Sequence, residues 1–175
     1  SNDGVDFPAP DLPSCRDSLD TTDAQPADDP DSIYAFRRLV EPWTAHSNGD
    51  ADACVVEGGV SEALGALGLS HARTASLSPY EALSWLAWTA ASGGAHGKRR
   101  GAATGRGEAW WFLATFVGLA DDWPCDPDEF GDVVNSLEFT AFTYDKAPTG
   151  GWGLHLVIED PEEGLAIALR ATDVE

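Results

Sequence analysis

The largest group of side chains able to bind an anion lies in the glycine-rich segment 93-GGAHGKRRGAATGRG-107. It holds four of the ten basic residues and six of the 18 glycines in a 175-residue chain of net charge −20. Arginine forms forked, charge-assisted hydrogen bonds with phosphate and carboxylate groups, and glycine lets backbone N–H groups approach the same anion. The segment therefore predicts an anion-accepting loop over residues 96–106. The predicted binding side chains are His96, Lys98, Arg99, Arg100 and Arg106.

A purely structural interpretation of the same segment stays open. Its first basic residues follow the end of a predicted helix over residues 79–92, where they would complement the negative end of the helix dipole and pair with nearby carboxylates. Gly97, Gly101 and Gly105 are four residues apart, so on a helix they would form a stripe that permits close approach of another backbone. The sequence supports the binding interpretation and the structural interpretation about equally.

Known catalytic, phosphate and metal motifs do not fit the sequence. The spacing from Gly93 to Lys98 is one residue too short for a P-loop, and Trp110 stands where a dinucleotide-binding pattern needs its third glycine. The acidic segment 121–131 fails as a calcium loop, because Phe130 takes the place of a ligand. The four histidines match no metal-binding spacing: His46, His71, His96 and His155. We therefore predict no catalytic residue, no metal site and no cofactor.

The composition indicates one globular domain. Hydrophobic residues make up 43% of the chain, and its longest strongly apolar run, at 109–120, is shorter than the roughly 20 residues that a membrane-spanning helix needs. Three widely spaced cysteines predict neither a disulfide framework nor a zinc site, so we expect a cytoplasmic protein. Only ten basic residues oppose thirty acidic ones, which argues against direct binding to duplex DNA.

The expected elements that position the glycine-rich segment are two apolar, Trp-rich helices on either side of it. Ser78, Pro79 and Glu81 are typical of a helix start, which predicts a helix over residues 79–92 that ends at Gly93. The second helix is expected from about residue 105 to 119.

After residue 136 the hydrophobic period changes to two, which predicts strands at 136–144, 152–159 and 164–171. Short turns between them make an antiparallel meander. The predicted fold class is α+β, with the Trp-rich helical pair packed on one face of a small three-stranded C-terminal sheet. The predicted domain covers residues 34–175. Residues 1–33, with nine aspartates and five prolines, are expected to form an irregular arm.

Three stretches carry a family pattern: 93-GGAHGKRRGAATGRGEAWW-111, 123-WP-124 and 152-WGLHLVIEDPEEGLAIALRATD-173. A Gly-rich Arg motif, a Trp pair and a strand pair closed by an acid-Pro turn resemble an uncharacterised bacterial family of unknown function. The similarity covers about the second half of the chain and leaves the first 33 residues outside. The resemblance implies that the Gly/Arg motif is a family hallmark, and it implies no catalytic residue.

From the sequence we expect a non-catalytic binding or regulatory protein whose partner is a phosphorylated small molecule or an acidic protein surface. An alternative is an acidic inhibitor or immunity-type protein that neutralises a basic partner such as a nuclease. A third is an enzyme acting on a phosphorylated substrate, with His96 as acid or base and Glu108 as the only nearby carboxylate. The sequence leaves the oligomeric state open.

Overall fold

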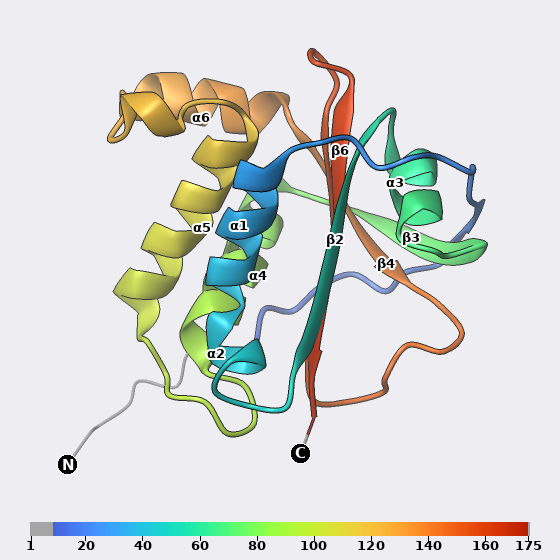
Figure 1. The fold of residues 1–175 in the computed structure, drawn as a ribbon, viewed down its shortest axis with the longest axis horizontal. Coiled ribbons are helices and arrows are strands. Elements are labelled where there is room, and N and C mark those ends of the chain that lie inside the picture. The colour runs from blue at the N-terminus through green and yellow to red at the C-terminus, as the bar shows by residue number, and fades with distance from the viewer. Residues whose placement is uncertain (1–8, 175) are drawn as a thin grey trace.

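The structure, a computed structural model, describes residues 9–174 as a twisted antiparallel sheet with helices on both faces (Figure 1). The sheet has six strands in the order β1-β3-β4-β5-β6-β2. Their bounds are β1 Asp17–Asp20, β2 Asp50–Glu57, β3 His71–Leu77, β4 Glu138–Thr143, β5 Trp152–Asp160 and β6 Leu165–Asp173. The predicted α+β class is thus confirmed, whereas the prediction of three strands is wrong.

The helices divide between the two faces of the sheet. Their bounds are α1 Pro30–Leu39, α2 Glu41–Thr44, α3 Val60–Ala66, α4 Pro79–Ser92, α5 Ala102–Phe116 and α6 Pro127–Ser136, with a 3₁₀ turn at Ala120–Asp122. In Figure 1, α1, α4 and α5 lie side by side on one face, and α3 lies on the other. No helix within residues 9–174 is long and apolar enough to cross a membrane.

Two hydrophobic clusters, one on each face, hold these layers together. Strand β5 contributes to both, because its side chains alternate: Leu154, Leu156 and Ile158 join the cluster under α4 and α5, while Val157 joins the cluster under α3.

The three strands beyond the predicted meander extend the sheet on both sides. Strand β3 pairs with β4, and β2 pairs with β6 over its whole length. In β3 the buried side chains include Ala72 and Ala75, and the spacing of its buried positions departs from strict alternation. Small apolar residues at irregular spacing give a weak strand pattern, which is why β3 did not stand out in the sequence.

Residues 1–33, predicted to form an irregular arm, include β1 and the first turn of α1. Strand β1 pairs with the edge of β3, and Leu19 packs against the α3-side cluster. Backbone bonds from Arg16 N to Thr74 O and from Thr21 N to Ser70 O continue this attachment. Residues 1–8 lie outside the described part, and the division of the chain at residue 34 stays a prediction.

The helical pair that flanks the Gly/Arg segment closely matches its sequence signals. Helix α4 has the predicted bounds: Ser78 and Glu81 exchange the two hydrogen bonds of a capping box, and Gly93 ends the helix in the left-handed conformation. Helix α5 starts at Ala102 and ends at Phe116, three residues earlier at each end than predicted. Gly97, Gly101 and Gly105 do not form the stripe that they would form on a single helix, because Gly97 and Gly101 precede α5 and, of the three, only Gly105 lies within it.

Candidate functional site

The Gly/Arg loop, residues 93–101, connects α4 to α5 and folds back against α2. Gly93 and Gly94 have φ angles of 79° and 66°, a conformation that glycine adopts without steric cost. A methyl group at Gly97 would overlap the carbonyl oxygens of both Gly93 and Pro42. Close backbone packing therefore seats this loop on α2.

Two hydrogen bonds fix the first half of the loop to distant parts of the chain. Ala95 N–H donates to Asp173 Oδ2 at 2.6 Å, and His96 N–H donates to Ser47 Oγ at 3.0 Å. Asp173, at the end of β6, is only 1% exposed. The loop is thus positioned by α2, by the turn that follows α2 and by the C-terminal strand.

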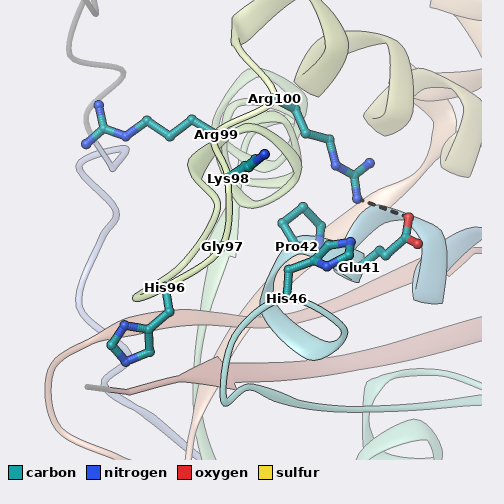
Figure 2. Close-up of a pocket in the computed structure, with 8 residues that line it drawn as sticks. All are labelled: Glu41, Pro42, His46, His96, Gly97, Lys98, Arg99 and Arg100. Carbon is teal, nitrogen blue, oxygen red and sulfur yellow. Dashed lines mark ion pairs between the residues drawn. The ribbon is translucent and has the colours of Figure 1, made fainter.

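An open hollow of about 480 Å³ lies between the loop and α2, and we call it the loop hollow. Figure 2 shows that its lining comes from two segments, residues 96–100 and residues 41–46. The lining residues are Glu41, Pro42, His46, His96, Gly97, Lys98, Arg99 and Arg100. Four of the five predicted binding residues therefore share one hollow.

Arg106, the fifth predicted residue, lies apart from them. It is exposed on the second turn of α5 and does not line the loop hollow. Conversely, sequence reasoning missed the contributions of Glu41, Pro42 and His46. They lie about fifty residues earlier in the chain, and no local pattern links them to the loop.

Lys98 and Arg100 have different electrostatic surroundings, although both line the hollow. Lys98 is exposed and forms no ion pair within the part of the chain that the structure describes. Its backbone N–H and that of Gly97 also donate to no acceptor among the described residues. Arg99 extends away from Arg100 in Figure 2. An ammonium group and two N–H groups beside bare glycine backbone are suited to an oxyanion.

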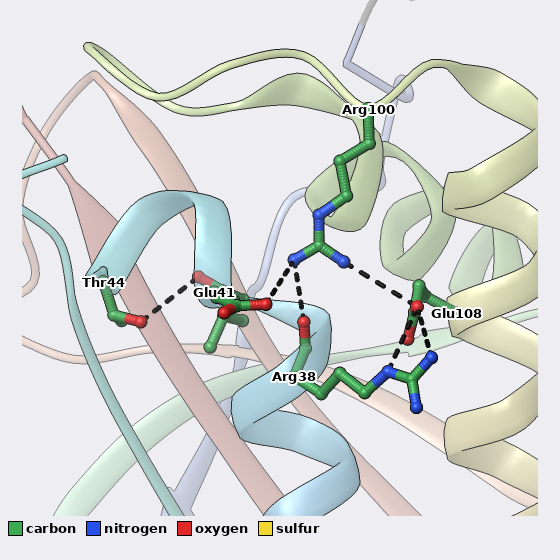
Figure 3. A network of polar contacts seen from close by, with 6 residues as sticks. Arg38, Glu41, Thr44, Arg100 and Glu108 are labelled. Carbon is green, nitrogen blue, oxygen red and sulfur yellow. Dashed lines mark hydrogen bonds and ion pairs between the residues drawn. The ribbon is translucent and has the colours of Figure 1, made fainter. Parts of the chain in front are cut away.

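Arg100 belongs to a network of internal charges (Figure 3). It donates a hydrogen bond to Arg38 O at 2.8 Å and lies 3.8 Å from Glu41 Oε2 and 3.9 Å from Glu108 Oε1. Arg38 donates from Nε and Nη2 to the same Glu108 oxygen, at 3.2 and 3.1 Å. Burial lowers the pKa of Arg100, and the two carboxylates oppose that shift.

The predicted binding role of Arg100 stays a prediction, but the residue also serves as an internal tie. It joins the loop to α1 and α5. In this respect the structural interpretation of the Gly/Arg segment applies to Arg100. The same network includes Glu108, whose Oε1 accepts hydrogen bonds from Arg38 and lies 3.9 Å from Arg100 Nη1. Among the described residues, this carboxylate forms no hydrogen bond with His96. Among residues 9–174, no group of three or more His, Cys, Asp or Glu side chains is placed to hold a metal ion.

His155, a second residue whose pKa is shifted, lies on the α3 face of the sheet, away from the loop hollow. Its ring packs 5.4 Å from Phe142 and 5.8 Å from Tyr144, measured between ring centroids. Arg170 lies over Tyr144 and pairs with Asp52 at 3.2 Å. Burial, with a smaller contribution from the charge of Arg170, lowers the pKa of His155 to about 4.

Comparison with known proteins identifies a family and no characterised relative. The model of DUF6183, a family of unknown function, matches residues 5–175. The match extends well beyond the second half of the chain, so the expectation that the first 33 residues lie outside the family is wrong. No curated protein and no solved structure matches the chain.

Proposed function

The chain belongs to DUF6183, a family of unknown function, and on that premise we propose that it is a non-catalytic binding or regulatory protein. Its loop hollow accepts the anionic group of a phosphorylated small molecule. The observation that carries this proposal is the ammonium group of Lys98, which has no ion-pair partner among residues 9–174 and lies beside bare glycine backbone in an open hollow of about 480 Å³.

Size and charge favour a small molecule over an acidic protein surface. A hollow of about 480 Å³ lies within the range of small-molecule sites, roughly 300–1,000 Å³. An acidic protein would have to approach a chain that carries thirty acidic residues against ten basic ones. Repulsion from the remaining surface opposes a large acidic partner more than a small anion, which contacts only the hollow.

A lysine substitution tests the proposal with inorganic pyrophosphate as the probe. Lys98→Gln removes a charge-assisted contact worth about 1.5–3 kcal/mol, so we expect the Kd for pyrophosphate to rise about tenfold or more. Because Lys98 is exposed, the free energy of unfolding should change by less than about 0.5 kcal/mol. Isothermal titration calorimetry measures the first quantity and urea unfolding the second.

The chain offers a matched control, because its other lysine, Lys146, is also an exposed loop residue. Lys146→Gln should leave pyrophosphate binding unchanged. Arg100→Ala is not diagnostic, since it would remove the ion pairs with Glu41 and Glu108 and the hydrogen bond to Arg38 O, and so alter stability as well as binding. Equal affinity in the wild type and in Lys98→Gln would contradict the proposal. Capture of a basic protein partner that is lost with rising salt but unaffected by Lys98→Gln would support the inhibitor alternative instead.

A further inference from the structure

Two more hollows, lined by residues of α1 and α5 and their flanks, lie near the loop hollow. The first, of about 410 Å³, is the arginine hollow, lined by Tyr34, Arg37, Arg38 and Glu41. The second, also about 410 Å³, is the tryptophan hollow, lined by Arg38, Thr104, Gly107, Glu108, Trp111 and Trp123.

Shared residues join the three hollows into one series. Glu41 lines both the loop hollow and the arginine hollow, and Arg38 lines both the arginine hollow and the tryptophan hollow. The guanidinium group of Arg100 bridges the two ends, because it lies 3.8 Å from Glu41 and 3.9 Å from Glu108 (Figure 3). The Arg100 guanidinium group therefore lies between residues that line the loop hollow and residues that line the tryptophan hollow.

The tryptophan hollow is suited to a planar ring. Trp111 and Trp123 are both partly exposed and meet edge to face, with ring centroids 6.1 Å apart. Gly107 adds no side chain to this wall, and nothing lies within 4 Å of the position where its Cβ would stand. Aromatic side chains stack on the faces of heterocyclic bases largely without regard to their identity.

Polar groups at the edge of the tryptophan hollow add hydrogen-bonding capacity. Thr104 supplies a hydroxyl group, and Glu108 supplies a carboxylate whose Oε2 is buried and has no hydrogen-bond partner among the described residues. An unpaired buried acceptor is costly, so a ring N–H that reached this carboxylate after a small side-chain rotation would relieve the cost.

From this arrangement we propose that the ligand is a nucleotide-like molecule, with its phosphate groups in the loop hollow and its planar ring in the tryptophan hollow. The inference rests on the proposed function, because it takes the loop hollow as the anion site. What it adds is the aromatic half of the ligand and the residues that hold it, Gly107, Trp111 and Trp123. Arg37 and Arg38 line the arginine hollow, between the loop hollow and the tryptophan hollow. Their positive charges favour a ligand whose negative charge lies at the end nearer the loop hollow.

Filling the tryptophan hollow at Gly107 tests the inference. Gly107→Leu places a side chain into open space on a helix, so the fold is retained. The probes are a panel of four nucleoside diphosphates (ADP, GDP, CDP and UDP) with inorganic pyrophosphate as the ring-free comparison. For the panel member that binds most tightly, we expect the variant to raise Kd about tenfold or more, while the Kd for pyrophosphate stays within about twofold of wild type.

The matched control is Gly131→Leu on α6, another helical glycine with nothing within 4 Å of its Cβ position, which should bind like the wild type. Lys98→Gln should raise the Kd for the nucleoside diphosphates and for pyrophosphate by similar factors. Equal affinity for all diphosphates and pyrophosphate, or unchanged diphosphate binding in Gly107→Leu, overturns the nucleotide inference and leaves the anion site standing. If neither the diphosphates nor pyrophosphate bind, both the inference and the proposed function fail.

Discussion

Lys98 and Arg100 lie two residues apart in one basic run, yet the tertiary structure places their charges in different surroundings. The Arg100 side chain is 19% exposed and faces the carboxylates of Glu41 and Glu108. Lys98 has no such partner in the described part of the chain and remains available to an external anion. Residue type alone predicts an anion-binding role for both, and only the position of the carboxylates separates them.

At the same scale, His155 predicts a pH dependence of stability. Its folded-state pKa of about 4 lies below the value of about 6.5 expected in the unfolded chain, so the unfolded state takes up the proton first as the pH falls. The stability that neutral His155 contributes is complete above about pH 6.5. It is lost toward pH 4 at a rate on the order of 1 kcal/mol per pH unit.

His155→Phe removes this titration and keeps an aromatic ring beside Phe142 and Tyr144. We expect the free energy of unfolding of the variant to fall less between pH 6.5 and 4 than that of the wild type, as measured by urea unfolding at each pH. Glu159, whose pKa is raised by burial and by neighbouring carboxylates, is present in both proteins and cancels in the comparison. If the free energy of unfolding falls equally with pH in the wild type and in His155→Phe, then His155 is not held neutral in the folded protein.

At the scale of elements, the contact between α4 and α5 depends on one glycine. A methyl group at Gly105 would overlap the carbonyl oxygen of Ala87 and lie 2.7 Å from Ala91 Cβ. Because the two helices support opposite ends of the Gly/Arg loop, their spacing also sets the geometry of the loop hollow.

Gly105→Ala should therefore destabilise the protein by about 1–3 kcal/mol through overpacking, although alanine favours a helix by about 1 kcal/mol over glycine. Gly107→Ala, two residues along the same helix, has open space and should gain up to about 1 kcal/mol. Urea unfolding of the two variants measures both effects. If Gly105→Ala raised the free energy of unfolding, then α4 and α5 would have to move apart to accept the methyl group without a loss of stability.

At the scale of the whole molecule, the charge distribution is uneven. The chain has thirty acidic and ten basic residues, and five of the ten basic residues line the three joined hollows. These five are Arg37, Arg38, Lys98, Arg99 and Arg100. The same hollows are also lined by Glu41 and Glu108, so basic residues outnumber acidic ones there, whereas acidic residues predominate over the whole chain. Under the proposed function, this local excess of positive charge would attract a small anion.

The net charge of −20 predicts that salt stabilises the fold. Raising the ionic strength from about 0.01 M to about 0.15 M shortens the screening length from about 30 Å to about 8 Å, so repulsion among the carboxylates weakens. We expect the thermal midpoint, followed by circular dichroism, to rise by several degrees, since about 1 kcal/mol corresponds to roughly 2–4 °C for a chain of this size. A falling midpoint would mean that ion pairs such as Arg38–Glu108 outweigh the repulsion.

Local signals in the sequence were enough for several elements. Helix α4 was predicted with its observed bounds, because a capping box at Ser78 and a left-handed Gly93 act over a few residues. Strands β5 and β6 followed from their period of two. In contrast, β1 was not predicted, because four residues in an aspartate-rich arm form a strand only when β3 is beside them. The hollows were not predicted, because their lining includes Glu41, Thr104 and Trp123, and no pattern in the sequence links these three residues.

By itself, the sequence determined that four of the ten basic residues and six of the 18 glycines gather in residues 93–107, where two apolar helices meet. Caps, turns and hydrophobic period predict those helices because they act between near neighbours in the chain. Only the tertiary structure decided that this loop packs on α2 and that Arg100 pairs with carboxylates from α2 and α5. It also decided that the basic surface continues to Trp111 and Trp123. These outcomes depend on contacts between residues far apart in the sequence, and such contacts form only when burial of the shared core brings their helices and strands together.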